Sequence, residues 1–148
     1  MFNMIYTKLT IKAMNLAYNA HHGQTDPSGV PYIFHPFHVA EQMDDEISVC
    51  VALLHDVVED TSVTIKDLSR EFPEEVVRAV KLLTHDSSDD YFNYLRQIKH
   101  DPCARKVKIA DVLHNSDQSR IACTDAVPEE KKNRWKEKYA RALEILTE

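Results

Sequence analysis

An apolar run that leads straight into charged residues limits the possible folds of this chain more than any other feature. Residues 47–54 (ISVCVALL) are apolar on almost every side, and they are followed by His55-Asp56 and, after two valines, by Glu59-Asp60. Periodicity alone also allows a buried strand, but the continuation through Val57-Val58 favours a central buried helix. Buried ionisable groups are costly unless they are paired or bind a metal. The run therefore predicts a central helix that ends at a site with its own chemistry.

Helical signals extend over the rest of the chain. Gly23 and Gly29 lie in one interior stretch, which is the strongest loop signal. Residues 64–67 (TIKD) resemble a capping box, and Asp101-Pro102 places a capping carboxylate before a proline at the first helical position. Three stripes of apolar residues recur at helical spacing: Leu9, Ala13, Leu16, Ala17 and Ala20; Val76, Val77, Val80, Leu82 and Leu83; and Trp135, Tyr139, Leu143 and Leu146. The pattern predicts an all-α fold, one compact domain of about seven or eight helices over residues 1–148, with the last helix at about 128–147.

Composition excludes several classes of protein. The 148 residues are 43% hydrophobic, enough for one ordinary domain with a real core, and no apolar run approaches the roughly 20 residues that span a bilayer. The N-terminus lacks the layout of a signal peptide, so we expect a cytoplasmic protein that does not bind a membrane. A net charge of −6 argues against binding to polymeric nucleic acid. Cys50, Cys103 and Cys123 form no CxxC pair and are expected to be reduced, small apolar residues. The sequence leaves a homo-oligomer open.

The spacing of the charged residues after the apolar run suits a metal site. His55 and Glu59 are four residues apart, as are Asp56 and Asp60, so each pair would share a helix face. Imidazole and carboxylate groups together are ligands of divalent first-row metals such as Mn, Fe or Zn. The alternative is a helix C-terminus with solvated acids and a capping histidine, and the His-Asp dipeptide alone does not decide between the two.

Two further segments add candidate ligands. His35 precedes a proline at a helix start, where its side chain is well placed to turn inward, although a lone histidine there is more often a structural hydrogen-bonding group. Asp111 lies within the apolar stretch 107–115, with Lys108 three residues before it and Asn115 four after it on the same helix face. The alternative for this segment is a Lys108–Asp111 pair on the surface of an amphipathic helix.

The order of these residues in the chain, H…HD…D, resembles the HD-domain superfamily of metal-dependent phosphohydrolases. The stretches AHHGQ, SGVPYIFHPFHVA, ALLHDVVEDT and VKIADVLHN are similar to the hydrolase domain of RelA/SpoT alarmone enzymes. The resemblance covers roughly residues 10–121, and in length the chain is similar to the free-standing small alarmone hydrolases. An HD dipeptide alone is weak evidence for the family, whereas four motifs in this order are a highly specific signal.

The resemblance implies an HD-domain helical bundle that removes the 3′-pyrophosphate of guanosine tetra- or pentaphosphate by means of a metal-activated water. The metal is expected to be Mn²⁺, with Fe, Zn or another first-row metal as alternatives, and the partner is a small phosphorylated nucleotide. The metal ligands implied are His35, His55, Asp56 and Asp111. The catalytic residues implied are Glu59 and Asp60, which would orient or deprotonate the attacking water and pass a proton. The residues expected to bind substrate are Asn115, Ser28, Lys108 and Tyr91.

Some positions depart from the family pattern. The family has Arg, Lys and Glu where this chain has Asp26, Pro27 and Val30, and the family arginine lies against the guanine base. An aspartate cannot stack or donate hydrogen bonds as an arginine does. The family also favours arginine at the position of Val112 and lysine at that of His85. Two alternatives therefore stay open. One is a phosphohydrolase that acts on a different phosphorylated nucleotide. The other is a domain that senses a nucleotide without turnover, although the complete set of candidate ligands argues against it.

Overall fold

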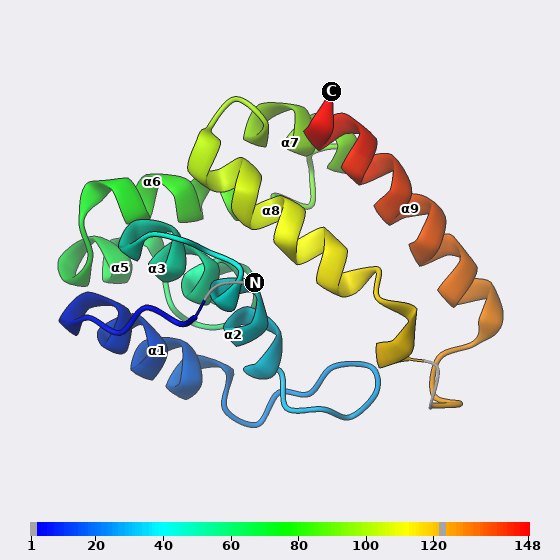
Figure 1. The fold of residues 1–148 in the computed structure, drawn as a ribbon, viewed down its shortest axis with the longest axis horizontal. Coiled ribbons are helices and arrows are strands. Elements are labelled where there is room, and N and C mark those ends of the chain that lie inside the picture. The colour runs from blue at the N-terminus through cyan, green and yellow to red at the C-terminus, as the bar shows by residue number, and fades with distance from the viewer. Residues whose placement is uncertain (1–2, 122–123) are drawn as a thin grey trace.

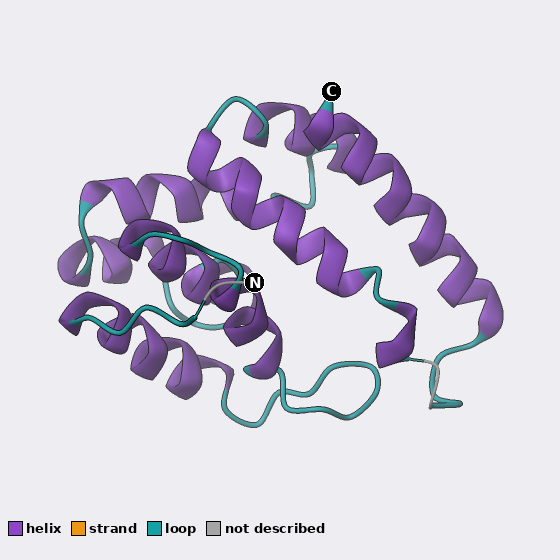
Figure 2. Ribbon diagram, viewed as in Figure 1, coloured by secondary structure: helices purple, strands orange, loops and turns teal. Residues whose placement is uncertain are grey.

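The computed structural model describes residues 3–121 and 124–148, and Figures 1 and 2 show helices joined by loops. The helical segments in chain order are α1 (Lys8–His21), α2 (Phe34–Glu41), α3 (Glu46–Leu54), α4 (Val57–Asp60), α5 (Ile65–Glu71), α6 (Glu74–Leu83), α7 (Tyr91–Ile98), α8 (Pro102–Asn115), the 3-10 turn η1 (Gln118–Arg120) and α9 (Glu129–Thr147). The described residues contain no β-strand, only one isolated bridge between Thr25 and Pro31. The predicted all-α fold is confirmed.

Helix α3 lies at the centre of the bundle. It packs against α1, α2, α6 and α8, and its residues from Val49 to Leu54 are at most 1% exposed. Asp45 caps its start by accepting a hydrogen bond from the backbone N–H of Ser48 (2.8 Å). The same carboxylate pairs with Lys106 of α8 (2.6 Å). The predicted central buried helix is confirmed over the bounds of α3.

The central helix is interrupted just where the acidic residues begin. His55 and Asp56 form a turn between α3 and α4. Both keep right-handed backbone angles, with φ −59° and ψ −27° at His55 and φ −107° and ψ −3° at Asp56. The N–H of Asp60 still donates to the carbonyl of Asp56 (2.9 Å). If α3 and α4 are counted as one interrupted helix, the described part of the chain has eight α-helices, within the predicted number.

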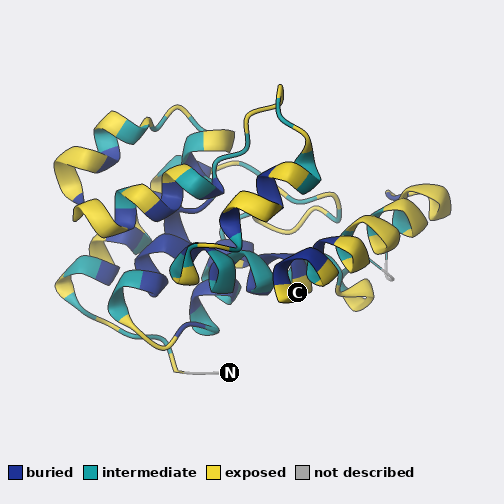
Figure 3. Ribbon diagram, turned by 90° about the horizontal axis from the view of Figure 1, so that it is seen from above, coloured by how far each residue is buried: buried dark blue, intermediate teal, exposed yellow. Residues whose placement is uncertain are grey.

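Helices α8 and α9 close one side of the bundle. α8 packs against α2, α3 and α6, while α9 packs against α7 and α8, and Figure 1 shows α9 along the outer side of α8. The buried residues of α9 are Ala142, Ile145 and Leu146, all in its C-terminal half, and Figure 3 shows most of the remaining helix exposed. The N-terminal half of α9 therefore extends past the core.

The loop between α1 and α2 is stabilised by its own aspartate. Gly23 and Gly29 have positive φ angles of 89° and 88°, a conformation that glycine adopts far more easily than other residues. The Oδ1 atom of Asp26 accepts hydrogen bonds from the backbone N–H groups of Ser28 (2.8 Å) and Val30 (3.0 Å). The predicted loop is confirmed, and Asp26 shapes it.

The remaining expectations about the whole chain concern membranes and cysteines. In the ranges 3–121 and 124–148, no helix combines the length and the apolar character that crossing a membrane requires. Cys50 is buried and Cys103 half-buried, and both are free thiols. Cys123 lies outside the described residues.

Thr64 begins α5 through a reciprocal pair of hydrogen bonds, which confirms the predicted capping box. Its Oγ1 accepts from the N–H of Asp67 (3.1 Å), and the Asp67 carboxylate accepts from the N–H of Thr64 (3.0 Å). We expect Thr64→Ala to lower the free energy of unfolding by about 1 kcal/mol in urea denaturation. The control Ser69→Ala, at an exposed position of the same helix, should change it by less than about 0.5 kcal/mol. Equal losses in the two variants would contradict a contribution from the cap.

Candidate metal centre

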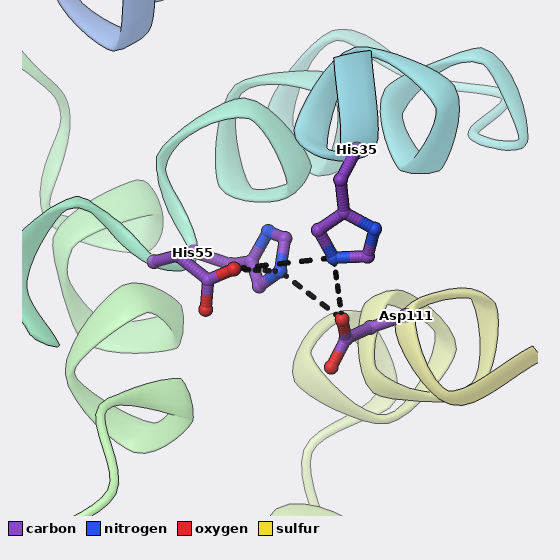
Figure 4. Close-up of side chains that lie close together, drawn as sticks. His35, His55 and Asp111 are labelled. Atoms are coloured by element: carbon purple, nitrogen blue, oxygen red, sulfur yellow. Dashed lines mark hydrogen bonds and ion pairs between the residues drawn. The ribbon is translucent and has the colours of Figure 1, made fainter. Parts of the chain in front are cut away.

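Four side chains from three parts of the chain meet beside the central helix (Figure 4). His35 comes from α2, His55 and Asp56 from the turn after α3, and Asp111 from α8. Their donor atoms all lie within 4.8 Å of one another. The distances from His35 Nε2 to Asp111 Oδ1 and from His55 Nε2 to Asp56 Oδ2 are 2.8 and 3.0 Å. All four side chains are at most 16% exposed, so the cluster is largely buried.

The orientation of His55 fits a bound cation. Its Nδ1 lies 2.5 Å from the carbonyl oxygen of Ala52, and because a carbonyl only accepts, this nitrogen carries a proton. Nε2 is buried without a hydrogen-bond partner, and it faces carboxylate oxygens of Asp56 and Asp111 at 3.0 and 3.4 Å. A lone pair facing two carboxylates is repulsive unless a positive charge lies between them. Two imidazole nitrogens and two carboxylates are also a ligand set that divalent first-row metals favour.

The electrostatics of the cluster lead to the same conclusion. Burial lowers the pKa of His55, but the carboxylates of Asp56 and Asp111 outweigh this effect and raise it well above its ordinary value. Burial opposes ionisation of Asp111, yet the Lys108 ammonium and the two histidines hold its pKa well below the usual range. The site therefore favours ionised carboxylates around a positive charge, which either a proton on His55 or a bound metal ion can supply.

Two neighbours on α8 hold both oxygens of Asp111. Lys108 Nζ lies 2.8 Å from Oδ2, and Asn115 donates to Oδ1 (3.1 Å). Both residues share a helix face with Asp111, as their spacing predicts. Lys108 is 13% exposed, so this is a buried pair rather than the surface pair that the sequence also allowed. Val112, at the position where the family pattern favours arginine, is fully buried.

Glu59 and Asp60 lie beside the cluster. Their carboxylates and that of Asp56 form a second group with donor atoms within 4.8 Å of one another. Glu59 accepts a hydrogen bond from the N–H of His85 (2.7 Å). Burial, together with the charges of Asp56 and Glu59, raises the pKa of Asp60 to about 6. A carboxyl group that titrates near neutrality is suited to proton transfer.

The four predicted substrate-binding residues fall into two groups. Ser28 and Asn115 line one cavity of about 130 Å³ with His35, and its wall includes Trp135 and Tyr139 of α9. Lys108 and Tyr91 form the other group, in which the Lys108 ammonium lies 5.8 Å from the centre of the Tyr91 ring. The structure thus brings all four close to the predicted ligands or to their neighbours.

Sequence reasoning missed several side chains at this site. The hydroxyl of Tyr32 donates to Asp56 Oδ2, and Nδ1 of His114 lies 2.7 Å from Nδ1 of His35. Both residues lie inside the quoted motifs, which was the available signal. The ammonium of Lys138 lies 4.3 Å from the centre of the Tyr91 ring, and no motif pointed to it. Arg120 approaches Asp26 (3.4 Å) and donates to the carbonyl of His114 (2.7 Å).

Comparison with known proteins gives consistent matches. The sequence model of a family described as HD domain matches residues 13–137. The chain is 37% identical over 126 residues to guanosine-3′,5′-bis(diphosphate) 3′-pyrophosphohydrolase MESH1 of Danio rerio, covering 76% of this chain and 70% of that protein. It is 35% identical over 126 residues to guanosine-3′,5′-bis(diphosphate) 3′-pyrophosphohydrolase of Borreliella burgdorferi, covering 73% of this chain but only 18% of that much longer protein.

One solved structure has the same fold as this chain over most of the length of both proteins. It is described as "A metazoan ortholog of SpoT hydrolyzes ppGpp and plays a role in starvation responses". The match has a TM-score of 0.74 and 25% sequence identity, and it covers 95% of this chain and 88% of the other. The helical arrangement around the four-residue cluster is therefore shared with a protein of similar size.

Proposed function

Because the chain belongs to the HD-domain family of metal-dependent phosphohydrolases, we propose that it removes the 3′-pyrophosphate from guanosine tetra- or pentaphosphate. The observation that carries this proposal is the buried cluster of two histidines and two aspartates beside a second carboxylate pair. The Danio rerio relative, of which this chain covers 70%, is named a 3′-pyrophosphohydrolase. A metal site next to groups that transfer protons supports hydrolysis of a phosphate ester.

The residues proposed to hold the metal are His35, His55, Asp56 and Asp111. When bound, a divalent ion polarises a phosphoryl oxygen and lowers the pKa of its water. We propose Mn²⁺, with Fe or Zn as alternatives, because nitrogen and carboxylate donors suit all three. Tyr32 and Lys108 keep Asp56 and Asp111 in place by donating to them.

Asp60 and Glu59 are the proposed proton-transfer pair. In the proposed hydrolysis, the oxygen of a water molecule adds to phosphorus, and the bond from that phosphorus to the ribose 3′ oxygen breaks. Asp60 takes the proton of the water and returns it to the leaving oxygen. Glu59 orients the water, and its own position is fixed by the N–H of His85.

The substrate is proposed to occupy both sides of the cluster. The cavity that contains Ser28 and Asn115 also has aromatic walls, which suit a nucleoside. The ammonium groups of Lys108 and Lys138 both lie over the Tyr91 ring, and we propose that their positive charge faces the phosphate groups. The protein is expected to act on a free nucleotide, since its net charge of −6 disfavours polymeric nucleic acid.

A second candidate keeps the reaction and changes the nucleotide. Asp26 lines the same cavity as Ser28, in place of the arginine that the family places against guanine. Its Oδ2 faces Arg120 at 3.4 Å, so the charges at this end of the cavity are arranged differently from the family pattern. This favours testing other phosphorylated nucleotides beside the guanosine alarmone.

The function is tested by following pyrophosphate release from guanosine tetraphosphate with the Mn²⁺-loaded protein. We expect release by the wild type and a loss of at least about 10²-fold in Asp56→Ala, which removes a proposed ligand. A panel of other nucleotides, including an adenine alarmone, is assayed in parallel. Absence of release above the Asp56→Ala background would refute the guanosine proposal, and a much faster reaction on another nucleotide would support the second candidate.

A further inference from the structure

His35 and His114 meet edge to edge at the rim of the proposed metal centre. Their Nδ1 atoms are 2.7 Å apart, whereas their ring centres are 5.0 Å apart and their planes differ by only 7°. The two nitrogens therefore point straight at each other within a common plane. This is the geometry of one N–H···N hydrogen bond, in which one ring donates and the other accepts.

The ring of His114 is itself fixed by its neighbours. His38, one turn after His35 on α2, stacks on it with ring centres 4.0 Å apart and planes 19° apart. The backbone carbonyl of His114 accepts a hydrogen bond from Arg120 Nη1 (2.7 Å). His114 also follows Asp111 by one helical turn, so α8 presents both residues to the same side of α2. The contact is thus built into the packing of α2 on α8.

The hydrogen bond determines which nitrogen of His35 is free for a metal. If His114 accepts, the proton of His35 lies on Nδ1, and the lone pair of Nε2 faces Asp111 Oδ1 (2.8 Å) and Asp56 Oδ2 (3.9 Å). If His114 donated instead, an N–H of His35 would point into the cluster and exclude a metal from that nitrogen. His55 needs no such partner, because the carbonyl of Ala52 already fixes its proton on Nδ1.

We infer that His114 is a positioning residue, which accepts a hydrogen bond from Nδ1 of His35 and so holds Nε2 as a metal-binding lone pair. Histidines that bind metals generally donate their other N–H to a fixed acceptor, and loss of that acceptor typically lowers metal affinity by about 10–100-fold. The inference rests on the proposed metal site but not on the identity of the nucleotide.

The test compares His114→Leu with His114→Asn, two side chains of nearly the same shape. The amide oxygen of asparagine can accept the hydrogen bond from His35, and leucine cannot. Co²⁺ alone is titrated into metal-free protein, with its visible absorption reporting binding. We expect leucine to weaken Co²⁺ binding by about 10–100-fold and asparagine to restore most of the affinity. His22→Ala, at an exposed histidine, is the control and should bind as the wild type does.

Thermal unfolding of the metal-free variants separates positioning from damage to the fold. Equal Co²⁺ affinity in the wild type and both His114 variants would overturn the inference while leaving the metal site intact. Equal loss in the leucine and asparagine variants would overturn it as well, because the acceptor would then have no effect. If the wild type and Asp56→Ala failed alike to bind Co²⁺, the proposed metal site would fail first and this inference with it.

Discussion

Replacing Asp60 by asparagine should lower kcat for pyrophosphate release by about 10²–10⁴-fold, the range that general acid–base groups usually contribute. Asparagine has nearly the same shape but cannot take a proton from water. Glu59→Gln should also lower kcat, because its carboxylate belongs to the same group as those of Asp56 and Asp60. Neither change removes one of the four proposed ligands, so metal content should be unchanged. The two measurements are kcat at saturating Mn²⁺ and elemental analysis of the purified variants.

The matched control for this pair is Glu75→Gln on the exposed start of α6. It makes the same chemical change away from the cluster and should leave kcat unaltered. A normal kcat in Asp60→Asn would assign proton transfer to another group. A loss of bound metal in the same variant would instead mean that the Asp56–Asp60 carboxylates hold a cation themselves.

Local signals in the sequence were sufficient to place the helices and several of their starts. The capping box at Thr64 and the Asp101-Pro102 start of α8 both formed as predicted, because caps depend on residues within one turn. The interruption after Leu54 was not predictable from periodicity. The apolar pattern continues into Val57, and His55 and Asp56 stay in the right-handed region, although the angles of Asp56 depart from ideal helical values.

Contacts of the candidate site between residues close in the sequence could be predicted, whereas contacts between distant residues could not be predicted from the sequence pattern alone. Lys108 and Asn115 could be placed beside Asp111 because they share one face of one helix, and both bond to it. The meeting of His35 with Asp111 joins residues 76 positions apart, and only the resemblance to a family suggested it. The contacts of His114 with His35 and of Lys138 with Tyr91 depend on how whole helices pack, for which a single sequence carries no direct signal.

Because Lys108 is buried, we expect the loss of its partner Asp111 to lower the stability of the protein strongly. The Lys108 ammonium pairs with Asp111 at 2.8 Å, and the two side chains are only 13% and 5% exposed. Asp111→Ala leaves this charge buried and unpaired, so we expect the metal-free protein to lose about 3–5 kcal/mol of its free energy of unfolding. Urea denaturation in the presence of a chelator measures the change without any contribution from bound metal.

A second substitution separates the unpaired charge from the general loss of side-chain contacts. Lys108→Met in the Asp111→Ala background removes the stranded ammonium and keeps an apolar stem, so it should recover a large part of the lost stability. Lys106→Met serves as the comparison, since it makes the same change on the same helix at an exposed ion pair. Lys106 is 40% exposed and pairs with Asp44 and Asp45. An exposed pair of this kind contributes at most about 1 kcal/mol. If Lys108→Met failed to rescue Asp111→Ala, the lost stability would come from the contacts of Asp111 with His35 and His55 and not from the lysine.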